Sequence, residues 1–368
     1  MRHFHCGNTL CFHPETEITG EGAYTMRSFL RPAAGLTCLF ALATAGCSAE
    51  SDSTSDAAST APETSSTATS EASSSATSYA PYVSATEASD NDSAGSPTTY
   101  NLAFVIADGS DCTPTWNDSH AIGDSTVKSR ISQLTEDGAT VRVSFGGASG
   151  KELAEACDSA SELAEAYGVA LDAADSTQAD FDVEGDALTD SDSVDLRSEA
   201  IALLQEERSD LTVSFTLPVM PSGLDDDSVA LLESANNSAV QVSTINLMTM
   251  NYGESYDDDM GDYAVTAAKA AHTQLMGVFG TSDSGAWQGM ALTSMIGTND
   301  VDGESFSLSD AAQVRTFAEE KEIAWVSMWS TFRDQQCESG NSDEDDALTN
   351  CSGVTQDAGA FGEAFAGS

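Results

Sequence analysis

Basic residues are scarce in this sequence: 13 Lys and Arg stand against 60 Asp and Glu in 368 residues, which gives a formal net charge of −47 at pH 7. Proteins that bind nucleic acid need clustered Lys and Arg to displace the counterions of the phosphates, so this class of function is excluded. An anionic lipid surface would repel the chain for the same reason. The charge predicts a soluble, self-repelling surface and favours a neutral or cationic ligand.

Tryptophan is scarce too, with four residues, although hydrophobic residues make up 40% of the chain and aromatic residues 7%. This composition is sufficient for a packed core, so we do not expect disorder throughout. At roughly 100–200 residues per domain, the length allows one large domain or two ordinary ones.

Residues 26–47 have the pattern of a signal peptide: a basic start, a short apolar stretch and small residues before Cys47. The apolar stretch is too short to span a membrane as a stop-transfer helix. Small residues followed by Cys47 resemble a bacterial lipobox, in which the Cys is acylated and becomes the first residue of the mature protein. Thr44 stands where Leu is usual, so a secretory signal without a lipid is the alternative. Because the signal begins at Met26, we interpret residues 1–25 as an over-extended gene start. We do not expect their His and Cys residues to form a metal site.

Residues 48–78 have the composition of a tether, since 18 of these 31 residues are Ser or Thr, five are acidic and none is basic. Such a segment cannot bury a core, and its acidic residues would keep it extended. We therefore expect a folded domain at residues 79–368, outside the cell and tethered to its membrane by the lipid, or secreted without it.

Four cysteines lie in the predicted folded domain: Cys112, Cys157, Cys337 and Cys351. In an exported protein they are expected to form disulfides, for which three pairings are possible. Cys337 and Cys351 would close a short local loop, which leaves Cys112 to pair with Cys157. A zinc site is the competing interpretation, but no Cys-x-x-Cys pair exists to support it.

Eight short runs rich in Val, Ile, Phe, Tyr and Met predict β-strands. They span residues 79–85, 100–107, 140–147, 179–185, 211–219, 244–252, 290–297 and 323–330. Stretches with helical periodicity lie between most of them, at residues 127–136, 152–174, 194–207, 228–235, 263–276 and 309–322. Strands that alternate with helices imply a parallel sheet with right-handed crossovers. Eight such units fit a single closed (β/α)8 TIM barrel of the α/β class, whereas a doubly wound sheet usually has fewer strands.

Chemistry in such a barrel is expected at the carboxyl ends of the strands. Asp180, Asp182 and Glu184 occupy alternate positions of the fourth strand, so their side chains share one face. Packed like charges raise one another's pKa, so at least one of these carboxyls should hold a proton near neutral pH. A protonated Glu beside an ionised Asp is what glycoside hydrolysis needs. In so acidic a chain the spacing alone is weak evidence for a site, and the alternative is that these acids lie on an exposed edge strand. Burial of carboxyl groups costs free energy, however, so three acids on a buried strand indicate a function.

Three other strand ends carry candidate ligand contacts. The third strand ends in Ser-Phe-Gly-Gly (144–147), and paired glycines permit a tight turn and a close approach of the backbone to a ligand. The sixth strand ends in Met-Thr-Met-Asn-Tyr (248–252), whose amide and phenol could hold an acetamido or hydroxyl group, while at least one Met is expected to fill the core. On the eighth strand Trp325 and Trp329 share a face, so either could form a floor for the apolar face of a sugar ring.

Together these strand ends resemble glycoside hydrolase family 18, the chitinases. The segments at 144–147, 180–184 and 248–252 and Trp329 follow the order and spacing of the family, and the resemblance covers most of residues 79–355. The fourth strand looks closest to the bacterial chitinase branch whose motif reads DFDVEG. Four matching strand ends in the right order are far more specific than any one of them.

By this resemblance, Glu184 is the general acid/base that protonates the glycosidic oxygen, and the substrate's own N-acetyl carbonyl attacks the anomeric carbon to form an oxazolinium ion. Asp182 would orient the acetamido group and stabilise this cation, and Asp180 would share charge and a proton with Asp182. Configuration is retained, and the resemblance implies no metal and no organic cofactor. The implied substrate-binding residues are Ser144, Gly146, Gly147, Met250, Asn251, Tyr252 and Trp329.

Two positions depart from the family pattern. Thr177 and Gln178 stand where the family's longer fourth-strand motif has Asp-Gly, which is remote from the bond cleaved, so we expect altered support and not loss of activity. Asn251 stands where many relatives carry Asp, which could shift the pH dependence or the hold on substrate. All three carboxyls of the fourth strand are present, whereas inactive lectin-like relatives commonly lose the position of Glu184.

We therefore expect an exported hydrolase of β-1,4-linked N-acetylglucosamine polymers. An endo-β-N-acetylglucosaminidase acting on other glycans is one alternative, and a carbohydrate-binding surface protein with little turnover is another, which the scarcity of Trp mildly favours. We expect a monomer whose partners are chitin or N-acetylglucosamine oligomers, with no nucleic acid, and with membrane contact only through the N-terminal lipid.

Overall fold

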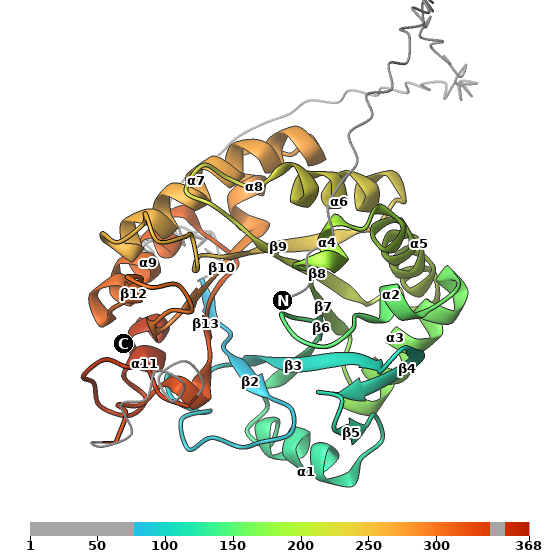
Figure 1. Cartoon of the computed structure of the whole chain (residues 1–368), viewed down its shortest axis with the longest axis horizontal. Helices are drawn as coiled ribbons and strands as arrows, with labels where there is room; N and C mark the ends of the chain where they lie inside the picture. The colour runs from blue at the N-terminus through green and yellow to red at the C-terminus, as the bar shows by residue number, and fades with distance from the viewer. Residues whose placement is uncertain (1–76, 339–349, 368) are drawn as a thin grey trace, which may run out of the picture. The chain divides into compact units, whose positions relative to one another are not determined.

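Strands around a centre, with helices outside them, organise the chain (Figure 1). The computed structural model describes residues 77–338 and 350–367, so the predicted gene extension, the signal peptide with Cys47 and the tether up to residue 76 lie outside the described residues. All eight predicted strands are confirmed. The parallel strands are β1 (Ser78–Tyr79), β2 (Tyr82–Ser84), β3 (Thr99–Asp108), β6 (Thr140–Gly146), β7 (Gln178–Asp182), β8 (Thr212–Pro218), β9 (Val242–Met248), β10 (Met290–Met295) and β13 (Trp325–Trp329).

The predicted closed barrel of eight parallel strands is confirmed only in part, because the sheet is mixed and its first strand is broken. β1 pairs with β13 and β2 pairs with β3, so the chain changes partners between them. Ala80 still donates its N–H to the Val326 carbonyl, but Pro81 has no N–H to continue the ladder, and its carbonyl accepts from Asn101. β4 (Asp111–Trp116) and β5 (His120–Ala121) add antiparallel strands beyond β3. Within the described residues, no continuous strand closes the sheet on itself.

The helices follow the predicted stretches, except that the stretch predicted at 152–174 is broken at residues 157–159 into two helices, and several short helices are added. They are α1 (Ser125–Leu134), α2 (Leu153–Ala156), α3 (Ala160–Ala174), α4 (Asp186–Thr189), α5 (Ser191–Glu207), α6 (Asp226–Asn237), α7 (Met260–Phe279), α8 (Asp283–Gln288), α9 (Leu308–Lys321), the 3₁₀ turn η1 (Thr331–Arg333) and α11 (Ala360–Ala366). Acidic and hydroxyl side chains begin many of them and accept first-turn N–H groups, which gives part of the acidic surface a structural role. These caps are Asp124, Ser159, Asp190, Asp225, Asp259, Ser282 and Ser307. No helix of the described ranges has both the length and the apolar character needed to cross a membrane.

The core lies between the sheet and the helices. Phe145, Phe181 and Phe215 on neighbouring strands pack ring against ring, and Tyr167 of α3 meets the first two edge-on. Successive side chains of a strand point to opposite faces, so the polar residues next to these outward aromatic residues point toward the interior of the sheet. A second, two-stranded sheet, β11 (Gly297–Thr298) with β12 (Ser305–Phe306), follows β10.

Both predicted disulfides are present. Cys112–Cys157 joins β4 to the end of α2, with 4.6 Å between the Cα atoms. Cys337–Cys351 spans 14 residues, with 5.1 Å between the Cα atoms.

Candidate active site

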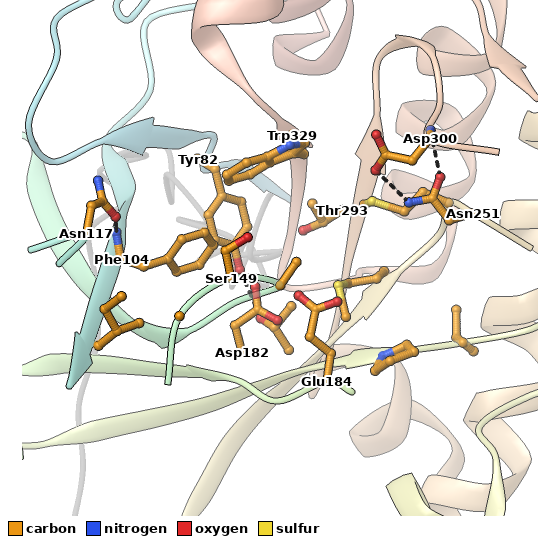
Figure 2. A pocket seen from close by; sticks show the side chains of 18 of the residues that line it. Tyr82, Phe104, Asn117, Ser149, Asp182, Glu184, Asn251, Thr293, Asp300 and Trp329 are labelled. Carbon is orange, nitrogen blue, oxygen red and sulfur yellow. Dashed lines mark hydrogen bonds between the residues drawn. The ribbon is translucent and has the colours of Figure 1, made fainter. Parts of the chain in front are cut away.

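A cavity of about 780 Å³ opens at the carboxyl ends of the parallel strands. Asp182, the last residue of β7, and Glu184, two residues further on, both line it. Figure 2 shows both side chains extending into the cavity from the same stretch of chain. Asp180 lies beneath them, buried, and β7 is a central strand between β6 and β8, which removes the exposed-edge alternative.

Asp180 is held by four hydroxyl groups. Tyr82 and Ser144 donate to its Oδ2 over 2.9 and 2.7 Å, and Ser214 and Thr216 donate to its Oδ1 over 2.7 and 2.8 Å. An ionised carboxylate only accepts hydrogen bonds, so four donors fit this form. Ser144, predicted to touch substrate, therefore supports Asp180 from β6 and does not line the cavity.

Asp182 is 5% exposed, and its Oδ1 has no hydrogen-bond partner among the described residues. Burial, followed by the charges of Glu184 and Asp180, raises the pKa of Asp182 well above its ordinary value. Packed acids raise one another's pKa in this way, so Asp182 holds a proton at higher pH than an exposed Asp does.

Glu184 is partly buried on the cavity wall. Burial, followed by the negative charge of Asp300, raises the pKa of Glu184. A raised pKa keeps a carboxyl group protonated nearer to neutral pH, as a general acid requires. Gly185, which follows it, has φ +59° and leads into α4.

An aromatic wall faces these carboxyls. Trp329 at the end of β13 stacks on Phe104 with ring centroids 5.5 Å apart and meets Tyr82 edge-on at 5.9 Å (Figure 2). All three side chains line the cavity, so Trp329 takes the predicted position. Trp325 does not: it is buried at the other end of β13, under the guanidinium of Arg142 at 3.9 Å.

The paired glycines lie behind the cavity and do not line it. Gly146 has φ +95°, and a Cβ at this position would collide with the carbonyl oxygen of Asp182. Gly147 has φ +88° and donates its N–H to the same oxygen, and a Cβ there would lie 2.9 Å from the Phe104 ring. These glycines therefore permit the close packing of β6 against Asp182.

The predicted sixth strand, 244–252, ends earlier than expected, because β9 stops at Met248 and Asn251 has φ +54°. Met248, Met250 and Asn251 line the cavity, so neither Met fills only the core. Tyr252 turns away and is buried against Tyr256 and Tyr263, and the structure therefore does not support its predicted substrate contact.

Asn251 is joined to an acid that the sequence did not indicate. Its Nδ2 donates to Asp300 Oδ2, and the Asp300 N–H donates to its Oδ1, each over 3.1 Å (Figure 2). Asp300 lies between β11 and β12. Glu304 of the same loop is 2% exposed and accepts the N–H of Gly253 over 2.7 Å, which fixes the backbone beside Asn251.

Several other residues of the cavity were not predicted. Tyr82 could have been predicted from the sequence, because it is an aromatic residue on the first predicted strand. Phe104 lies on β3, where the register with β6 shifts between Leu102 and Val105, and Asn117 and Ser149 lie in loops. The additional lining residues include Tyr82, Phe104, Asn117, Asp118, Ser149, Thr216, Asp225, Thr293 and Asp300. No group of three or more His, Cys, Asp or Glu in the described ranges could hold a metal ion.

The fold is similar to that of solved chitinase catalytic domains. The solved catalytic domain of a hyperthermophilic chitinase from Pyrococcus furiosus has 28% sequence identity and a TM-score of 0.68, over 78% of this chain and 93% of that one. A GH18 chitinase from Pseudoalteromonas aurantia shares the fold at 14% identity and a TM-score of 0.53, over 69% of this chain and 94% of that one.

Curated relatives are of the same type. The chain is 33% identical over 275 residues to a probable bifunctional chitinase/lysozyme of Escherichia coli K12, and 31% identical over 274 residues to endochitinase 11 of Metarhizium anisopliae. Each match covers 70% of this chain, but 31% of the first relative and 52% of the second. No protein-family model matches the sequence. The chain is therefore similar to chitinases in sequence and to chitinase catalytic domains in fold.

Proposed function

We propose that this protein is a retaining hydrolase of β-1,4-linked N-acetylglucosamine polymers, a chitinase of the branch with the DFDVEG motif. The observation that carries the proposal is the row of three acids at the end of β7. It leads from buried Asp180 through Asp182 to Glu184, on the wall of a cavity that Trp329 also lines. The similarity to chitinase catalytic domains supports the same assignment.

In the proposed reaction, Glu184 gives its proton to the glycosidic oxygen while the acetamido oxygen of the substrate attacks the anomeric carbon. The leaving sugar departs as an alcohol, and the positive charge passes to an oxazolinium ion. Glu184, now a carboxylate, takes a proton from the water that opens this ion, and configuration is retained. Each proton that Glu184 gives is thus returned within one turnover.

The other residues hold the sugar during this sequence. Asp182 lies beside Glu184 with one oxygen unpartnered in the described structure, so its carboxyl group is available to the acetamido N–H. Trp329 would lie against the apolar face of the sugar, and Asn251, placed by Asp300, would reach its polar edge. The charge of Asp182 would then stabilise the oxazolinium cation once its proton is shared with Asp180.

The test is release of a fluorophore from chitobiose and chitotriose conjugates by the full chain. Glu184→Gln should lower turnover at least 10²-fold, because it removes the general acid without changing the shape of the side chain. The matched control is Glu199→Gln on the exposed face of α5, which should leave turnover unchanged.

Absence of turnover on both conjugates together with measurable binding to chitin would contradict the proposal and indicate a binding protein. Turnover confined to the N-acetylglucosamine core of a glycan would indicate an endo-β-N-acetylglucosaminidase.

We also propose that the protein is exported and anchored through an acylated Cys47. Expression in a bacterial host with a radiolabelled fatty acid should label the wild type and leave a Cys47→Ala variant unlabelled. An unlabelled wild type recovered from the culture medium would indicate a plain secretory signal.

A further inference from the structure

The interior of the sheet contains a cation that the proposed reaction does not use. Arg142 lies on β6 and is 8% exposed. Burial of a guanidinium is costly unless opposite charge or hydrogen bonds compensate for it. The surroundings of Arg142 therefore indicate what it does.

Neutral groups surround this guanidinium at contact distance. Nη1 donates to Asn101 Oδ1 over 2.7 Å, Nη2 donates to Gln178 Oε1 over 3.1 Å, and the Trp325 ring lies 3.9 Å from Cζ. Arg142 makes no ion pair with a carboxylate of the described residues, unlike Arg197, whose guanidinium binds Glu152. Its positive charge is thus not neutralised by a direct partner.

The nearest acid by strand position is Asp180. Ser144 is the register partner of Asp180 and donates to it, and Arg142 precedes Ser144 by two residues on the same face of β6. At about 3.3 Å per residue, Arg142 starts roughly 7 Å below the level of Asp180. The four hydroxyl groups around Asp180 are neutral, so they orient this carboxylate without balancing its charge.

We propose that Arg142 is the counter-charge of Asp180, a positioning residue that stabilises the negative charge shared by the Asp180–Asp182 pair. The inference rests on the proposed function, since it assigns a residue to the reaction of this site. Two unit charges at this separation inside a protein still interact strongly, because little water screens them. Arg142 acts through Asp180 and touches no substrate.

The titratable groups around Arg142 are few. β2 contributes the Tyr82 phenol and β7 contributes Asp180, whereas Asn101, Gln178 and Trp325 are neutral. Burial lowers the pKa of Arg142, and the charge of Asp180 opposes this shift. The pair therefore balances charge inside the sheet.

The first experiment compares the pH dependence of kcat/KM for wild type, Arg142→Gln and Arg142→Lys. Arg142→Gln should move the acidic limb to higher pH by about one to two units, because the acid pair loses its first proton less readily without the cation. Arg142→Lys retains the charge, and its limb should stay within about half a unit of wild type.

Arg208→Gln is the matched control: it removes the same charge from a partly exposed ion pair with Asp172, and its pH profile should be unchanged. An acidic limb of Arg142→Gln within about 0.3 unit of wild type, in a protein with wild-type circular dichroism, would overturn the proposal.

A second variant covers the case in which Arg142→Gln does not fold. Gln178→Glu is isosteric and places a carboxylate where Arg142 now meets an amide, so it should also raise the acidic limb by about one unit. A carboxyl ¹³C NMR titration of the Asp180–Asp182 pair in wild type and Gln178→Glu gives the same comparison without turnover. An unchanged titration overturns the counter-charge, whereas a shifted titration in a protein that cleaves neither conjugate supports it and refutes only the proposed function.

Discussion

Gly146→Ala tests whether the fit of β6 against Asp182 matters for catalysis. The two residues are register partners, and a Cβ at Gly146 would collide with the Asp182 carbonyl oxygen, so the strand ends must move apart by on the order of 1 Å. A misplacement of this size costs a catalytic group on the order of 10²-fold in rate. We therefore expect kcat to fall about 10²-fold, with a smaller change in KM.

The positive φ of Gly146 adds strain of its own, which a control must separate. Gly138 has φ +87°, and a Cβ there would meet nothing within 4 Å, so Gly138→Ala introduces the strain without the collision. Each variant should lose about 1–2 kcal/mol of unfolding free energy through φ, and Gly146→Ala about 1–3 kcal/mol more through overpacking. Urea unfolding and initial rates on the chitotriose conjugate measure both effects. Equal kcat in the two variants would refute the argument.

Three further predictions concern charge and stability. Asp300→Asn should lower the pKa of Glu184 and move the alkaline limb of kcat/KM to lower pH, and an unchanged limb would exclude Asp300 as a determinant. The pKa of Asp182 is raised on folding, so the folded state loses stability as pH rises above the ordinary Asp range. Asp182→Asn removes this loss and should raise Tm at pH 7, by about 2–4 °C per kcal/mol, but not at pH 3. Equal shifts of Tm at both pH values would contradict this prediction. Replacing Cys112 and Cys157 by Ser should cost about 4 kcal/mol of unfolding free energy in urea, from the 45-residue separation, and a loss below about 1 kcal/mol would argue against the bond.

Local periodicity predicted the parts of the site that lie on regular strands. The alternation of β7 is regular, so the inward side of Asp180 and Asp182 followed from the sequence. The predicted substrate contact of Tyr252 rested on its place at the end of a strand and on the family resemblance, and β9 ends earlier, at Met248, with a positive φ at Asn251.

Residues whose position depends on distant parts of the chain could not be predicted from local sequence patterns. Trp325 shares a face with Trp329, but four residues along a strand separate them by about 13 Å, so only one reaches the cavity. Asp300 comes from a loop whose path depends on tertiary packing, and no local pattern marked it. Pro81 lay inside a predicted strand, where its missing N–H splits the strand between two partners.

The configuration of the first product tests directly whether the protein cleaves its substrate with retention. Proton NMR of chitotetraose hydrolysis by the full chain, recorded before mutarotation, distinguishes the two anomers at the new reducing end. The proposed reaction gives the β-anomer first, because the acetamido group and then water attack from opposite faces. The α-anomer as the first product would contradict it.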